Sequence, residues 1–209
     1  MRSLLVLGLV LGVAFGVGCK QKPADGDSPP VGSGSASDDD QREQQRFDTE
    51  RRPDKIVEAL AIGPGSRVAD IGAGSGLLTV HLARAVAPNG RVIATDIDGA
   101  VLDLLAARLK KAGLSDVVER RVVGADRPEL EEGAYDAILL AEVDHFFPDP
   151  AAWLREAAKA LKPNGRIVIS NRVYHRAQAM AAAKKAGLVL KSESNPVSTH
   201  YIAVFVVGK

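Results

Sequence analysis

The strongest constraint on the fold is an alternation between short apolar runs and longer amphipathic stretches, which continues from Arg46 to the C-terminus. Strand-sized apolar runs occupy residues 67–71, 91–96, 117–123, 136–142 and 166–170. Helix-sized amphipathic stretches precede or separate most of them, at residues 53–60, 77–87, 98–111, 150–161 and 177–186. This alternation predicts a parallel sheet that is covered by helices.

Two further apolar runs, at residues 188–193 and 201–207, follow near the C-terminus. The seven residues between them are too few for the crossover that a parallel pair requires, so these two strands are expected to be antiparallel. The prediction for residues 46–209 is therefore a single α/β domain. Its sheet is doubly wound, seven-stranded and mostly parallel, with an antiparallel C-terminal strand pair, which is not how a nicotinamide-binding Rossmann domain ends.

A glycine-rich turn follows the first predicted strand. Residues 68–76 read Val-Ala-Asp-Ile-Gly-Ala-Gly-Ser-Gly, and glycines at such a turn let a ligand approach the main chain closely. The dinucleotide-binding fingerprint would require glycine at position 77, where this chain has Leu77. It would also not call for an acid such as Asp70 two residues before the first glycine. A tight turn that binds nothing is the structural alternative.

Acidic side chains come at the ends of the next strands. Asp96 ends the second strand and precedes Ile97, and its two oxygens suit the vicinal hydroxyls of a ribose. Ala125 and Asp126 follow the third strand, and Glu142 ends the fourth. Because the carboxyl ends of parallel strands share one sheet edge, these residues are expected to line one ligand site.

This combination resembles the class I S-adenosylmethionine-dependent methyltransferases, in which an acid and glycines of this spacing form motif I. Residues 135–140 and 161–169 resemble later motifs of the family, with Asn164 in place of a glycine. The chain is similar to the quinone-biosynthesis and isoaspartyl methyltransferases in particular. The resemblance implies S-adenosylmethionine as cofactor, with Asp70 near its amino group and Asp126 near the adenine amino group. The residues implied to bind it are Asp70, Gly72, Ala73, Gly74, Gly76, Asp96, Ile97, Ala125, Asp126 and Glu142.

The segment after the fourth strand is where this family places substrate-facing groups. His145 is the candidate general base, and Asp144 either orients it or contacts the substrate. The structural alternative for this pair is a loop histidine beside an aspartate that bonds the backbone. His175 is a second candidate for a residue that lines the substrate site. The segment lacks the tetrapeptide Asn-Pro-Pro-Phe (or Tyr) of amino-directed nucleic-acid methyltransferases. A small molecule or a cell-envelope component is therefore the expected methyl acceptor.

The N-terminus resembles a bacterial lipoprotein signal peptide. Arg2 is followed by an uncharged apolar run to Gly18, too short to span a bilayer, and then by Cys19. The prediction is a signal peptide at 1–19, lipidation of Cys19 and a disordered linker at 20–45. The domain would then be anchored to a membrane of the cell envelope, facing the periplasm. Ordinary cleavage, a short uncleaved anchor and a mis-assigned start codon are the alternatives.

The composition excludes several classes of protein. The formal net charge is +1, without the basic excess that general nucleic-acid binding requires. Cys19 is the only cysteine, so the chain has no intramolecular disulfide and too few ligands for a Cys/His zinc site. An exported domain would be separated from the cytoplasm, where S-adenosylmethionine is made. A membrane-tethered, non-catalytic binding module is therefore one alternative to an active methyltransferase, and a nicotinamide oxidoreductase is another.

Overall fold

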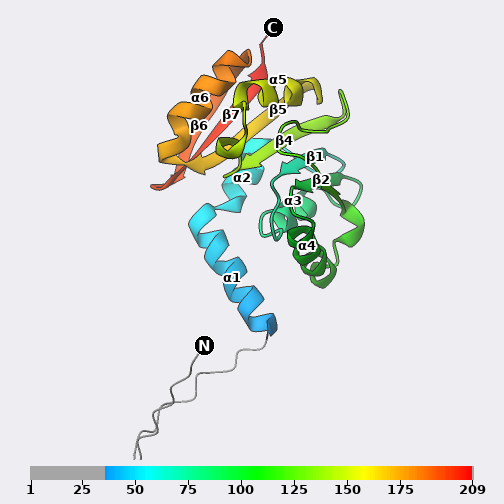
Figure 1. Cartoon of the computed structure of the whole chain (residues 1–209). Coiled ribbons are helices and arrows are strands. Elements are labelled where there is room, and N and C mark those ends of the chain that lie inside the picture. The colour runs from blue at the N-terminus through cyan, green and yellow to red at the C-terminus, as the bar shows by residue number, and fades with distance from the viewer. Residues whose placement is uncertain (1–35, 209) are drawn as a thin grey trace, which may run out of the picture. The chain divides into compact units, whose positions relative to one another are not determined.

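The computed structural model describes residues 36–208, and Figure 1 shows their arrangement. The helices are α1 (Ala36–Arg51), α2 (Pro53–Leu60), α3 (Thr79–Val86), α4 (Gly99–Ala112), α5 (Pro150–Lys159) and α6 (Arg176–Lys185). The strands are β1 (Arg67–Ile71), β2 (Arg91–Asp96), β3 (Val118–Val122), β4 (Tyr135–Ala141), β5 (Leu161–Arg172), β6 (Leu188–Val197) and β7 (His200–Val207). Short 3-10 turns are η1 (Ser115–Val117), η2 (Asp144–Phe146) and η3 (Val173–His175).

All seven strands form one sheet in the order β3-β2-β1-β4-β5-β7-β6. Strands β1 to β5 are parallel, and β7 pairs antiparallel with both β5 and β6. The expected antiparallel C-terminal pair is thus confirmed. The chain winds outward from β1 to β3 and then returns to place β4 on the other side of β1. Loops that leave β1 and β4 consequently diverge, which opens a crevice at the carboxyl ends of these strands.

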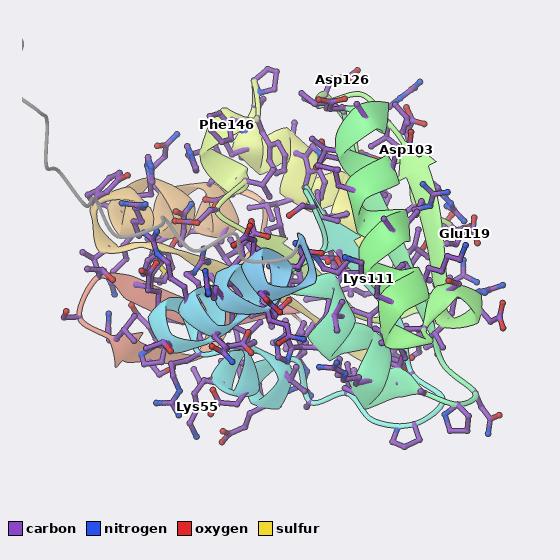
Figure 2. The ribbon with its side chains drawn as sticks, turned by 90° about the horizontal axis from the view of Figure 1, so that it is seen from below. Lys55, Asp103, Lys111, Glu119, Asp126 and Phe146 are labelled. Atoms are coloured by element: carbon purple, nitrogen blue, oxygen red, sulfur yellow. The ribbon has the colours of Figure 1, made fainter. Side chains whose placement is uncertain are left out.

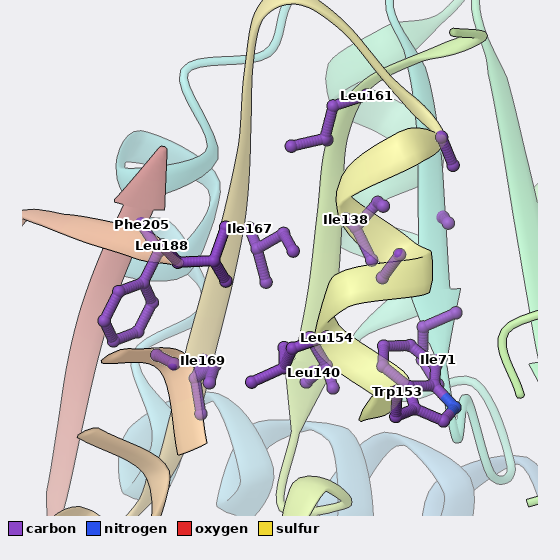
Figure 3. Packing of buried hydrophobic residues seen from close by; sticks show 14 of the residues in the cluster. Ile71, Ile138, Leu140, Trp153, Leu154, Leu161, Ile167, Ile169, Leu188 and Phe205 are labelled. Atoms are coloured by element: carbon purple, nitrogen blue, oxygen red, sulfur yellow. The ribbon is translucent and has the colours of Figure 1, made fainter. Parts of the chain in front are cut away.

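Each face of the sheet has its own hydrophobic core. Strand residues alternate between the faces, so Ile138 and Leu140 join one core while Leu139 joins the other. The first core packs against α5 and α6, and Figure 3 shows Trp153 and Leu154 of α5 beside the strands. The second core packs against α2, α3 and α4. Burying β1 and β4 on both faces explains why their sequences read as continuous apolar runs.

The helix boundaries follow from local capping chemistry. The Asp98 side chain accepts a hydrogen bond from the Ala100 N–H at 2.8 Å, and Asp149 does the same for Ala152 at 2.9 Å. Pro150 occupies the first turn of α5, where its missing N–H costs nothing. Gly113 ends α4 in the left-handed conformation, with a φ of 68°. All four residues lie at the ends of the helices that they bound, so these signals are local in the sequence.

The folded domain begins earlier in the chain than the sequence indicated. The expected linker ended at residue 45, whereas α1 starts at Ala36 and belongs to the same compact unit as the rest of the domain. α1 is too polar to give an apolar signal, and ion pairs of Asp40 with Lys111 and of Glu43 with Arg108 hold it against α4. Figure 2 shows α1 crossing the view beside Lys111.

The expected signal peptide, Cys19 and linker residues 20–35 lie outside the described residues. Within residues 36–208, no helix has the length and apolar character needed to cross a membrane.

The capping bond of Asp98 gives a prediction about stability. Replacing Asp98 with alanine leaves the Ala100 N–H without its side-chain partner, so the free energy of unfolding should fall by about 1 kcal/mol in urea denaturation. Asp103→Ala in the same helix is the matched control, because that exposed carboxylate makes only a surface ion pair with Arg120. Equal losses in the two variants would contradict the assigned cap.

Candidate functional site

The loop between β1 and α3 can be formed only with glycine at two of its positions. Gly72 and Gly76 have φ values of 67° and 85°. A Cβ on Gly72 would lie 2.7 Å from Val143, and one on Gly76 would lie 2.7 Å from Leu105. Gly74 also has a positive φ, of 55°, but has no neighbour within 4 Å of a Cβ position. The loop is therefore packed at both ends and open in the middle, where a ligand can approach its main chain.

Asp96 is held in a fixed orientation at the end of β2. One carboxylate oxygen accepts the Gly74 N–H at 2.9 Å, and the other accepts the Asp98 N–H at 3.1 Å. A carboxylate has about four lone-pair positions, so two backbone bonds leave acceptor capacity for a ligand. The first bond also ties the glycine loop to β2, as expected of two parts of one site.

A cavity of about 420 Å³ lies at this sheet edge. Its size suits a small molecule, and its walls combine apolar side chains with a few polar ones. Its walls are formed by residues at the carboxyl ends of β1, β2 and β4 and in the loop after β3. The wall includes Ile71, Gly72, Thr95, Asp96, Ile97, Val123, Gly124, Ala125, Arg127, Glu142, Val143, Phe146, Phe147 and Trp153.

Five of the residues expected to bind the cofactor line this cavity, namely Gly72, Asp96, Ile97, Ala125 and Glu142. Others lie near it without forming its wall. The Ala73 N–H donates to the Thr95 carbonyl at 2.9 Å, which fixes the loop on β2. Asp126 is exposed, and Figure 2 shows it at the same edge of the molecule as Phe146.

Asp70 lies beneath the glycine loop and is 2% exposed. The Thr79 hydroxyl donates to it at 2.7 Å, which links the end of β1 to the first turn of α3. Burial raises the pKa of Asp70 to about 6, and the charge of Asp96 acts in the same direction while the Thr79 bond opposes it. The main role of Asp70 in the structure is therefore to hold the end of β1 against α3 through its bond with Thr79.

Glu142 stands in the cavity wall with a left-handed φ of 55°. Arg51 of α1 pairs with one of its oxygens. Arg172 and His200 approach the other at 3.0 and 3.1 Å. Burial alone would raise the pKa of Glu142, but the charge of Arg51 and the bonds from His200 and Arg172 outweigh it, so its pKa is lowered. Glu142 therefore joins α1, β5 and β7 around the cavity.

Two polar groups that the sequence did not single out stand out by their burial. The Arg51 side chain is 10% exposed, and its Nε and Nη2 have no hydrogen-bond partner among residues 36–208. The Thr95 hydroxyl, in the cavity wall, likewise has none in this part of the chain. Buried donors of this kind fit a ligand that carries an anionic group and hydroxyls. For the buried Arg51, the only signal in the sequence was the pair of adjacent arginines, Arg51 and Arg52, before Pro53.

The two candidate catalytic residues are joined through a third. Asn171, fully buried at the end of β5, donates one N–H to Asp144 at 2.7 Å and approaches Nδ1 of His145 at 3.0 Å. Asp144 is 4% exposed, and burial raises its pKa against the opposing Asn171 bond. The His145 ring stacks on His175 with centroids 4.0 Å apart. The structure thus brings both expected histidines together.

Within residues 36–208, no cluster of three or more His, Cys, Asp or Glu is arranged to hold a metal ion.

Comparison with known proteins agrees with this geometry. Residues 69–167 match the family described as "Methyltransferase domain". The chain is similar to a ubiquinone biosynthesis O-methyltransferase of Xanthomonas campestris pv. campestris (strain B100). The two are 33% identical over 156 residues, which are 74% of this chain and 62% of that protein. The chain thus spans less than two thirds of the length of this relative.

Solved structures with the same fold include a SAM-dependent methyltransferase from Aquifex aeolicus. It has a TM-score of 0.72 and 19% identity, over 80% of this chain and 96% of that one. The cyclase SpnF has a TM-score of 0.66 and 16% identity, over 76% and 82% of the two chains. The expected fold is confirmed, and so is the expected similarity to quinone-biosynthesis methyltransferases. Residues 69–167 thus match a methyltransferase-domain family, and the solved structures show the same fold.

The raised pKa of Asp70 gives a prediction with a defined sign. The folded chain holds this proton until about pH 6 and the unfolded chain loses it near the ordinary value of 3.8, so ionisation lowers stability as pH rises through this window. Asp70→Asn removes that titration and can still accept the Thr79 hydroxyl. Relative to wild type, the variant should therefore gain up to about 3 kcal/mol in free energy of unfolding between pH 4 and pH 7.

Urea denaturation at several pH values measures this difference. Asp116→Asn is the control, because that side chain is exposed and its variant should keep the pH dependence of wild type. A difference between Asp70→Asn and wild type that does not change with pH would contradict the burial of an uncharged Asp70.

Proposed function

We propose that this chain binds S-adenosylmethionine in the cavity at the carboxyl ends of β1, β2 and β4, and that it methylates a small molecule. The observation that carries the proposal is the Asp96 carboxylate, which Gly74 and Asp98 orient in the cavity wall. Its remaining lone pairs suit the two ribose hydroxyls. The family match over residues 69–167 supports the same cofactor.

Other residues fit the remaining parts of this cofactor. The open main chain at Gly74 allows close approach of its methionine part, and Ile97 and Ala125 offer apolar contact to the adenine ring. The two unpartnered donors of Arg51 suit its carboxylate. When bound, the cofactor supplies a methyl group on a positively charged sulfur. The residues of the chain then have to align the acceptor with that group and exclude water.

We propose an oxygen of an aromatic small molecule as the acceptor. The name of the Xanthomonas relative specifies O-methylation in ubiquinone biosynthesis, and this supports the same kind of acceptor here. Phe146, Phe147 and Trp153 supply aromatic rings to the cavity wall, where they can pack on a flat ligand. A cell-envelope component remains the alternative acceptor, and a non-catalytic binding module the alternative function. Incubation with labelled cofactor and a panel of phenols and catechols separates an enzyme from such a module.

We further propose that residues 1–19 are a lipoprotein signal peptide and that Cys19 anchors the domain to a membrane of the cell envelope. The apolar run before Cys19 and the polar, Pro- and Gly-rich stretch after it support this assignment.

Binding of the cofactor is predicted to depend on Asp96. In calorimetric titration of the full chain, S-adenosylmethionine and S-adenosylhomocysteine should bind and NAD should not. Asp96→Ala should weaken S-adenosylmethionine binding by about 1–3 kcal/mol, because a charged partner of a buried hydrogen bond is lost. Asp116→Ala, at an exposed position outside the cavity, should bind as wild type does. Unchanged affinity in Asp96→Ala would place the ribose elsewhere.

Lipidation is predicted to depend on Cys19. In a bacterial host, the full-length chain should incorporate labelled fatty acid and fractionate with membranes, and Cys19→Ser should abolish both. The test has no competing thiol, because the chain contains one cysteine. A soluble, unlabelled wild-type product would exclude the lipoprotein.

A further inference from the structure

The rim of the cavity carries four neighbouring rings, here called the ring stack. The rings of His145 and His175 are stacked at an interplanar angle of 14°, and the outer rings of Phe146 and Tyr174 are tilted against them by 39° and 53°. Phe146 and His145 come from η2, and His175 and Tyr174 come from η3. The centroids of neighbouring rings are 4.0 Å apart from Phe146 to His145, 4.0 Å from His145 to His175 and 4.3 Å from His175 to Tyr174. Phe146 also lines the cavity, so this ring stack continues the cavity wall outward. The outer rings of Phe146 and Tyr174 are 70% and 69% exposed.

Hydrogen bonds beneath the stack fix which nitrogen of His145 carries a proton. The Arg172 N–H donates to Oδ1 of Asn171 at 2.7 Å, which orients the amide. The amide nitrogen of Asn171 must then donate, and it has one N–H for Asp144 at 2.7 Å and one for Nδ1 of His145 at 3.0 Å. Nδ1 of His145 is therefore an acceptor, and the proton of the neutral ring lies on Nε2.

The surroundings of His145 keep the ring neutral. Burial lowers the pKa of His145, the neighbouring His175 lowers it further, and the charges of Asp144 and Glu142 oppose them. Protonation at Nδ1 would also turn an N–H toward the N–H of Asn171, which cannot accept it. A neutral ring with its proton on Nε2 can donate from that atom but cannot take a proton there. This differs from the general base that the sequence predicts.

Nε2 is also the nitrogen that a ligand can reach. Nδ1 faces Asn171, which is fully buried, so the opposite edge of the ring points away from the core. Among residues 36–208, the structure gives Nε2 of His145 no hydrogen-bond partner. The ring stack thus presents one unpaired N–H donor between exposed aromatic surfaces, beside the cavity.

We infer that the methyl acceptor is a flat aromatic compound that binds the ring stack with an anionic oxygen, and that this oxygen accepts the Nε2–H of His145. Asn171 is the positioning residue that sets the tautomer. The inference rests on the proposed function, because it assigns the acceptor of that same site. It requires no base at His145, since the oxygen is already ionised when it binds.

Nitrogen NMR of the full chain, labelled in its four histidines, tests the tautomer without any substrate. His145→Gln identifies the His145 signals by their loss. We expect protonated Nε2 and unprotonated Nδ1 at pH 7 in wild type. A proton on Nδ1 would overturn the inference, whether or not the chain binds S-adenosylmethionine, so its failure is distinguishable from failure of the proposed function.

Titration with p-nitrophenol tests the donor, because the absorbance of this probe reports its ionisation. Wild type should bind the phenolate and enrich it over the neutral phenol. His145→Gln keeps an N–H donor and no base, and it should bind within about threefold of wild type. His145→Phe keeps the stacking surface and should bind about tenfold or more weakly, as expected for one lost hydrogen bond to a charged group.

p-Nitroanisole, which cannot ionise, is the matched control probe and should bind wild type and His145→Phe alike, because both keep a ring at position 145. The inference is overturned if wild type does not enrich the phenolate, or if His145→Gln loses as much affinity as His145→Phe.

Discussion

The reversal of strand order at β1 is the constraint on which the site depends. β2 lies on one side of β1 and β4 on the other, so the loops after β1 and β4 lead to helices on opposite faces of the sheet. A cavity opens between these loops. The loops after β1 and β4 approach each other so closely that a side chain on Gly72 would collide with Val143, the residue that follows Glu142.

The acids at the strand ends differ in chemistry because their surroundings differ. Asp96 is oriented by two backbone N–H groups in the cavity wall, whereas Asp70 is buried under the loop and its pKa is raised to about 6. The pKa of Glu142 moves the opposite way because Arg51, Arg172 and His200 surround it. Similar residue types at neighbouring strand ends thus have three different roles: Asp96 is the ligand contact that we propose, Asp70 links strand and helix, and Glu142 is the centre of an ion cluster.

The rim, rather than the sheet, sets the specificity that we propose. The cyclase SpnF shares this fold, so the sheet by itself does not define one reaction. Here the turns after β4 and β5 bring His145 and His175 into stacking contact. Asn171 lies at the end of β5, and its amide reaches both Asp144 and His145. The same sheet edge therefore combines the cavity that we propose for the cofactor with an aromatic surface that carries the donor inferred at His145.

The sequence by itself determined the alternation of strands and helices, the antiparallel end of the sheet, the caps at Asp98 and Asp149 and the glycine loop. These depend on periodicity, turn residues and capping bonds within a few residues along the chain. Only the tertiary structure decided that α1 belongs to the domain, because ion pairs with α4 hold this polar helix and leave no periodic signal. It also decided the partners of Glu142 and the contact with Asn171 from which we infer the tautomer of His145. These depend on Arg51, His200 and Asn171, which come from distant parts of the chain and meet only in the folded protein.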